Sequence, residues 1–141
     1  MNQIALNHHH LLNRTEQLQL DFGYLNETTS GNKIFQLELA QIFLSEVPMD
    51  LEAIALALSK KDLFAASKIA HSMKSTVGYM GFAHNIGTQL TEFEMACIEE
   101  NDISLLLSAF EVIKNNLEKA KELVNNSFFQ STNFVELASD H

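Results

Sequence analysis

The chain has 141 residues, of which 46% are apolar and 19% are charged, and this composition fits one soluble globular domain. Its net charge of −9 argues against a nucleic-acid backbone as the partner. The single cysteine, Cys97, excludes an internal disulfide and a cysteine-based zinc finger. No apolar run approaches the roughly 18 residues of a membrane span, and the N-terminus lacks a signal-peptide pattern. We therefore expect a cytoplasmic protein that does not insert into membranes.

The two ends of the chain lack strong helix signals. Residues 1–18 are predicted to form an N-terminal arm, and residues 127–141 a C-terminal tail that either docks loosely or is disordered. The arm contains three consecutive histidines, His8 to His10, which would suggest a metal site. On a helix, however, successive side chains point about 100° apart, so these three do not form one site and we assign no metal.

Residues 19–126 carry apolar side chains at helical spacing. A short helix is predicted to end near Thr28, with a turn at residues 30–32. The next apolar-periodic stretch, 35–58, contains Pro48, which we expect to kink or restart the helix. The reason is that proline removes a backbone N–H and clashes with the preceding turn.

Three further helices are predicted, and two of them begin at aspartate caps, Asp62 and Asp102. Their predicted ranges are 63–82, 86–100 and 103–126, with a turn at 83–85 before the second of them. Short loops force neighbouring helices to run antiparallel. The predicted fold class is therefore all-α, an antiparallel up-down four-helix bundle with a short additional N-terminal helix.

The segment AHSMKSTVGYMGF, residues 70–82, places a histidine on a stripe that faces away from the predicted core. At 100° per residue, the core stripe of this helix is Ala66, Ile69, Met73, Val77 and Met80. The opposite stripe consists of Phe64, Lys68, His71, Ser75, Gly78 and Phe82, and it is flanked by Ser67 and Lys74. We therefore expect His71 to be exposed.

The neighbours of His71 leave room for a bulky partner and suggest an anionic group on the histidine itself. Ser75 and Gly78 are small and leave clearance, although glycine inside a helix costs about 1 kcal/mol relative to alanine. Phe64 and Phe82 bracket the histidine as a docking patch, and Lys74 is within i,i+3 reach of an anion on His71. A neutral imidazole nitrogen is a good nucleophile, which suggests phosphoryl transfer. With no second base, phosphate loop or metal cluster evident, the catalytic machinery would come from a partner.

These residues resemble the signature of histidine-containing phosphotransfer (Hpt) domains, in which a helix reads Ala-His, two residues, Lys-Gly, and a second glycine six residues later. Ala70-His71, Lys74 and Gly81 match this pattern, and the resemblance extends over about 100 residues. The resemblance implies that His71 is phosphorylated on Nε2 and that Lys74 holds the phosphoryl group. It also implies that receiver domains, including that of a hybrid histidine kinase, are the partners and that they supply the Mg²⁺. We expect no cofactor of its own and a monomer.

The chain departs from the family pattern at Ser75, which stands where the family usually has glycine. Its small hydroxyl leaves clearance and is able to hydrogen-bond a phosphoryl oxygen, but it could also slow the approach of a receiver. The resemblance further suggests a polar residue near the histidine on the following helix, for which Gln89 is the candidate. Docking is assigned to Phe64, Ser67, Lys68 and Phe82.

Three other interpretations remain open at this point. The domain could be a helical adaptor that binds a partner through the same face and is never phosphorylated. It could be the phosphorylation helix of a histidine kinase, although the acidic residue usual after the histidine is Ser72 here. It could be a metal-binding bundle, although no Glu-x-x-His pair occurs and the acidic residues around Glu92 and Glu94 are expected to be a solvated face.

Overall fold

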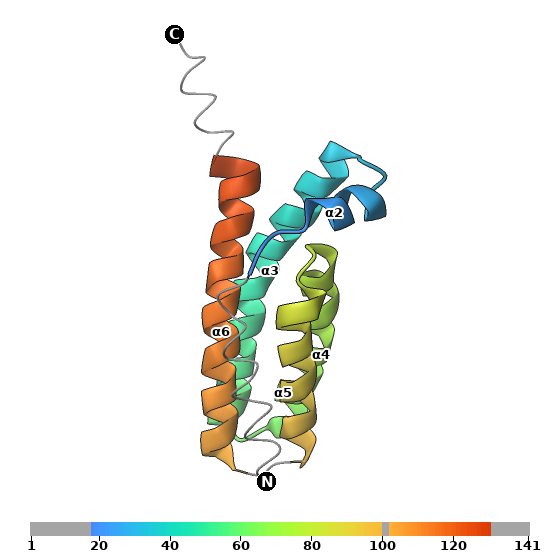
Figure 1. Ribbon diagram of the computed structural model, residues 1–141. Helices are drawn as coiled ribbons and strands as arrows, with labels where there is room; N and C mark the ends of the chain where they lie inside the picture. Colours follow the sequence, from blue (N-terminus) through green and yellow to red (C-terminus); the bar gives the residue numbers. More distant parts are fainter. Residues whose placement is uncertain (1–17, 100–101, 131–141) are drawn as a thin grey trace.

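The computed structural model describes residues 18–99 and 102–130, and these residues form helices and no strand. The helices are α2 (Phe22–Thr28), α3 (Lys33–Ser59), α4 (Leu63–Tyr79), α5 (Thr88–Glu99) and α6 (Ile103–Asn125), with π-helical turns η2 (Ala83–Gly87) and η3 (Asn126–Gln130) (Figure 1). The histidine triplet and most of the predicted arm, 1–17, lie outside the described residues, as does the tail from residue 131 onward.

Helices α3 to α6 run alternately up and down and form a four-helix bundle, as predicted (Figure 1). Both α3 and α5 pack against α4 and α6, so α3 and α5 lie diagonally across the bundle. The short helix α2 lies across the end of the bundle where α3 begins. The bundle interior is apolar and includes Phe43, Ile54, Met73, Leu90 and Leu117. In the described part of the chain, no helix is long and apolar enough to cross a membrane.

Four helices begin at a capping side chain. The side-chain oxygen of the capping residue accepts a hydrogen bond from a backbone N–H two or three residues further on, at 3.0 or 3.1 Å. Such a bond satisfies one of the N–H groups that a helix start leaves without a partner. The capping residues are Asp21, Asn32, Asp62 and Asp102. The predicted caps Asp62 and Asp102 are thereby confirmed.

Pro48 lies inside α3, which continues as one helix from Lys33 to Ser59. Of the two outcomes expected at this proline, a kink or a restart of the helix, the restart is therefore wrong. Proline removes one backbone hydrogen bond, but Val47 and Leu51 on either side of it are buried in the core. Tertiary packing of a helix face contributes most of the stability of a helix in a protein, so one lost bond does not divide α3.

The connection between α4 and α5 differs from the predicted turn at 83–85. Helix α4 ends at Tyr79, and Gly81 adopts a left-handed conformation with φ of +87° before the π-helical turn η2 begins. A Cβ atom on Gly81 would lie 3.2 Å from the Cβ of Asp21. Glycine at this position therefore allows both the change of chain direction and the close approach of the start of α2.

Buried amide side chains connect neighbouring helices. Gln89 of α5 accepts a hydrogen bond of 2.8 Å from the Nδ2 of Asn116 on α6. Gln36 of α3 donates from Nε2 to Asn26 and to Thr29, both at 2.9 Å, and so attaches α2 to the bundle. Because a buried amide without a partner is costly, each pair favours a single alignment of the helices that it joins.

The end of the described chain packs against its beginning. The ring of Phe128 in η3 lies 6.0 Å from the ring of Phe22 in α2, measured between centroids. Phe128 and Phe129 are both partly buried against the core. The first residues of the predicted tail are therefore helical and contact the bundle.

Candidate functional site

His71 lies in the middle of α4 and its side chain is 66% exposed. Met73 and Val77, on the opposite stripe of the same helix, are buried. The helical periodicity of residues 63–80 therefore predicted the orientation of His71 correctly.

The carboxylate of Glu94 joins His71 to Lys74. One oxygen, Oε2, lies 2.9 Å from the Nδ1 of His71, and the other, Oε1, lies 2.9 Å from the Nζ of Lys74. Glu94 belongs to α5, whereas the two basic residues are one turn apart on α4. The cluster therefore lies over the seam between α4 and α5.

The hydrogen bond from His71 to Glu94 determines which ring nitrogen carries the proton. An ionised carboxylate can only accept, so Nδ1 of His71 must donate. In the neutral imidazole the other nitrogen, Nε2, then has no proton and keeps its lone pair. Because the ring is exposed, an electrophile brought by a partner can reach this nitrogen. The arrangement is that of an oriented nucleophile.

Glu94 is held in its ionised form by these partners. The hydrogen bond from Lys74 is the main cause that lowers the pKa of Glu94; the positive charge of Lys74 adds to it, as does that of His71 when its ring is protonated. Partial burial of the carboxylate acts in the opposite direction but is outweighed. Glu94 is thus ionised throughout the neutral pH range and remains an acceptor for the Nδ1 proton.

The sequence model of the Hpt domain family matches residues 38–123, which is more than half of the chain. This chain belongs to the Hpt domain family. Hpt domains carry out phosphotransfer in two-component phosphorelays as phosphocarriers rather than catalysts, and they interact with receiver domains and histidine kinases. Neither the comparison with curated proteins nor the comparison with solved structures finds a match.

The polar residue beside the histidine of this Hpt domain is Glu94 and not the predicted Gln89. Gln89 is 6% exposed and bonds Asn116 of α6, so it faces away from α4. Five residues separate the two side chains on α5, which turns Glu94 by about 140° relative to Gln89. The sequence predicts a solvated face for Glu94, because periodicity alone does not give the rotation of α5 relative to α4.

Two of the four predicted docking residues are exposed. Phe64 is 71% exposed, and the Nζ of Lys68, also exposed, lies 5.3 Å from the centre of its ring. Both lie on the N-terminal side of His71 on α4. An exposed aromatic ring beside a cation is suited to contact with an acidic protein surface.

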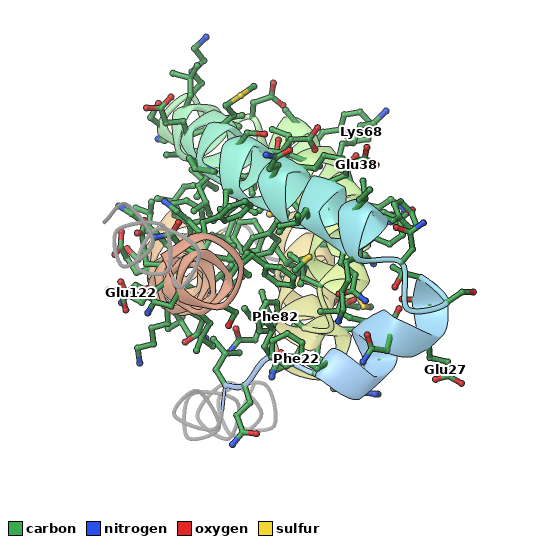
Figure 2. All side chains as sticks on the ribbon, turned by 90° about the horizontal axis from the view of Figure 1, so that it is seen from above. Phe22, Glu27, Glu38, Lys68, Phe82 and Glu122 are labelled. Atoms are coloured by element: carbon green, nitrogen blue, oxygen red, sulfur yellow. The ribbon has the colours of Figure 1, made fainter. Side chains whose placement is uncertain are left out.

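Phe82 and Ser67 are buried, and their assignment to a docking surface is wrong. Phe82 is 0% exposed and its ring lies 5.8 Å from that of Phe43 inside the bundle (Figure 2). The periodicity of α4 was extended past its end at Tyr79, where the left-handed Gly81 turns the chain into the core. Ser67 is 5% exposed, and its small size suits the buried margin of α4.

Ser75 and Gly78 lie on the C-terminal side of His71. Ser75 is exposed, and a Cβ atom on Gly78 would meet no other atom within 4 Å. Gly78 is therefore not required by packing inside this chain. The space above it is open to a partner that approaches His71.

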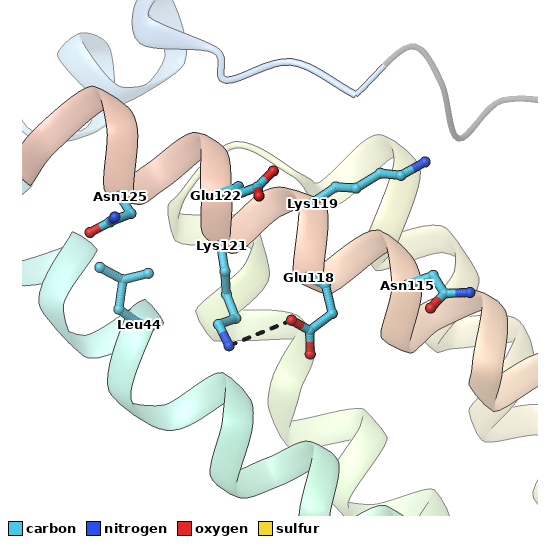
Figure 3. A pocket seen from close by; sticks show the side chains of 7 residues that line it. All are labelled: Leu44, Asn115, Glu118, Lys119, Lys121, Glu122 and Asn125. Carbon is cyan, nitrogen blue, oxygen red and sulfur yellow. Dashed lines mark ion pairs between the residues drawn. The ribbon is translucent and has the colours of Figure 1, made fainter. Parts of the chain in front are cut away.

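An open groove on another side of the Hpt domain contains none of the predicted site residues. It lies along α6 beside Leu44 of α3, and an ion pair of 3.8 Å joins Lys121 and Glu118 of α6 at its edge (Figure 3). Its lining residues are Leu44, Asn115, Glu118, Lys119, Lys121, Glu122 and Asn125.

The described residues hold no group of three His, Cys, Asp or Glu side chains that could bind a metal ion. Burial raises the pKa of the Cys97 thiol to about 11, which makes it a poor nucleophile.

Proposed function

We propose that His71 accepts a phosphoryl group from the phosphorylated aspartate of one receiver domain and passes it to the aspartate of another. The observation that carries this proposal is the 2.9 Å hydrogen bond between Nδ1 of the exposed His71 and Glu94. It presents Nε2 to a partner with its lone pair free. Membership of the Hpt family supports the same role.

In the proposed step, Nε2 of His71 attacks the phosphorus of the aspartyl phosphate. A nitrogen–phosphorus bond forms, and the bond between phosphorus and the aspartate oxygen breaks, so the receiver recovers a free carboxylate. The Nδ1 proton stays on the ring, and the positive charge that develops on the imidazole is stabilised by Glu94. In the second step, which is the reverse reaction with another receiver, the phosphoryl group passes from His71 to the aspartate of that receiver.

Phosphoryl transfer has two further requirements: the reacting groups must be positioned in line, and the negative charge on the oxygens of the transferred phosphoryl group must be neutralised. Lys74 is close enough to direct its ammonium group toward a phosphoryl group on His71, one turn away. The exposed hydroxyl of Ser75 is a second candidate donor. Mg²⁺ and the remaining catalytic groups are assigned to the receiver domain.

The test is transfer of radioactive phosphate from a labelled phospho-receiver to this protein and to its His71→Gln variant. Because His71 is exposed, the variant should fold like the parent, which circular dichroism and thermal unfolding will check. We expect the parent to acquire label that is labile to acid and stable to base, as phosphohistidine is. The variant should acquire none.

Label on the His71→Gln variant would assign phosphorylation to another residue. Absence of label on the folded parent with every receiver tried, combined with binding of a receiver, would favour the adaptor interpretation. In that case Ser75→Gly is the next variant to measure, because Ser75 stands where the family usually has glycine. Restored labelling would identify Ser75 as the obstacle.

A further inference from the structure

The outer side of α3 carries a line of exposed apolar side chains. Phe35, Ile42, Met49 and Leu56 are 42–67% exposed and follow one another at intervals of seven residues. Seven residues are almost two complete helical turns, so these side chains point in nearly the same direction. We call these four residues the α3 outer line. It extends along most of a helix of 27 residues.

Carboxylates lie on both sides of the α3 outer line. At 100° per residue, Glu38 and Glu52 fall on one side of it, and Glu46 and Asp50 on the other. Residues 34–59 contain no lysine, arginine or histidine. Figure 2 shows Glu38 projecting from the outer side of α3, away from the buried Phe82. Partial burial and the charge of Glu46 raise the pKa of Asp50, so two of these carboxylates are close enough to act on each other.

The α3 outer line is separate from the site around His71. His71 and Glu94 lie over the seam between α4 and α5. Helix α3 lies diagonally across the bundle from α5, and its outer side points away from the core that the helices share. The four residues of the α3 outer line therefore lie on a different helix from His71 and from Glu94.

We propose that the α3 outer line binds a cationic amphipathic helix of a partner protein. Apolar side chains at heptad spacing are the pattern that one helix offers to another in coiled coils and helix-binding surfaces. Lysine or arginine residues beside the apolar stripe of the partner would pair with the carboxylates on both sides of the line. The proposal concerns a second surface and does not depend on phosphorylation of His71.

The charge of this face decides between the possible occupants. A second copy of the chain would place two rows of carboxylates against each other, and each copy has a net charge of −9. An anionic lipid surface would be repelled for the same reason. A basic helix satisfies both the apolar and the acidic features.

The test uses a fluorescently labelled synthetic peptide of four heptads, with leucine at positions a and d and lysine at e and g. A matched peptide carries glutamate at e and g. Binding is followed by fluorescence anisotropy with the parent protein, with the double variant Ile42→Gln/Met49→Gln, and with the control variant Ile98→Gln/Leu105→Gln. The four substituted side chains are 44–67% exposed, so these substitutions leave the core intact.

We expect the lysine peptide to bind the parent and the control variant, and to bind the Ile42→Gln/Met49→Gln variant at least about tenfold more weakly. Binding should weaken with added salt, and the glutamate peptide should not bind. No binding of the lysine peptide, or a loss confined to the control variant, overturns the proposal. Dimerisation in sedimentation that the Ile42→Gln/Met49→Gln variant abolishes would also overturn it and assign the face to a second copy. Labelling at His71 should be unchanged in both variants.

Discussion

Glu94 is the residue whose role most depends on its surroundings, because one carboxylate serves both His71 and Lys74. We predict that Glu94→Gln slows phosphoryl transfer to His71. The amide keeps the shape of the side chain but loses the charge that stabilises a positive imidazole. Hydrogen bonds to charged groups contribute about 1.5–3 kcal/mol, and the lower end, suited to this partly exposed site, corresponds to about tenfold in rate.

The measurement is the initial rate of labelling by a phospho-receiver. Glu92→Gln is the matched control, since Glu92 lies on the same helix and shows no ion pair in the described structure. An unchanged rate in Glu94→Gln, with a normal rate in the control, would show that the hydrogen bond to Nδ1 has no part in transfer.

The same carboxylate gives the folding stability a defined dependence on pH. Because the pKa of Glu94 is lowered in the folded protein, its proton is held more weakly there than in the unfolded chain. Its contribution to the free energy of unfolding is therefore complete above about pH 4.5, the ordinary pKa of a glutamate, and is lost as the pH falls through the lowered value.

We predict that urea unfolding midpoints of the parent and Glu94→Gln differ above pH 5 and converge at lower pH. A constant difference between the two proteins across the acid range would contradict this assignment.

The positions of His71 and Lys74 could be predicted from the sequence because both residues lie on one regular helix. Glu94 could not, because its position requires the rotation of α5 about its own axis.

At the scale of helices, Gly78 and Gly81 lie only three residues apart in the sequence but have different structural roles. Gly81 has φ of +87° and lies against Asp21, whereas the position of a Cβ on Gly78 is open. We predict that Gly81→Ala lowers the free energy of unfolding by about 1–2 kcal/mol through the left-handed conformation alone. Gly78→Ala should raise it by up to about 1 kcal/mol through better helix propensity.

Urea titrations of both variants measure these changes. If the clearance above Gly78 serves a partner, Gly78→Ala will be the more stable protein and the slower phosphoryl acceptor. Equal stability of the two alanine variants would contradict the distinction.

The helices themselves were largely predictable. Apolar periodicity and the caps Asp62 and Asp102 gave the bundle, since these depend on residues a few positions apart. The errors arose where local rules compete with tertiary packing. Pro48 does not interrupt α3, because the residues beside it are buried, and Phe82 is internal because the chain turns at Gly81.

At the scale of the whole molecule, the described chain is closed by contacts between its two ends. Phe128 packs against Phe22, and both belong to short segments that have little core of their own. We predict that Phe128→Ala lowers the free energy of unfolding by about 1–2 kcal/mol, through lost apolar burial and the lost ring pair. Phe64→Ala, at a 71% exposed ring, is the control and should change stability little.

Thermal and urea unfolding of both variants will test this. Equal stability of Phe128→Ala and the parent would show that η3 does not contribute to the fold. The sequence left open whether the tail docks, because a short aromatic segment among serines and asparagines fits either state.

The buried pair of Gln89 and Asn116 has a consequence for the tolerance of the reactive cluster. If α5 slid by one helical turn along its neighbours, every residue on it would move by about 5.4 Å. Both amides would then be buried without partners, and the carboxylate of Glu94 would lie beyond hydrogen-bond reach of Nδ1, to which it is now 2.9 Å away. The buried amide pair of α5 and α6 thus keeps Glu94 at the position where it accepts the Nδ1 proton of His71. A displacement of α5 within the core would remove the contact that fixes the tautomer of His71.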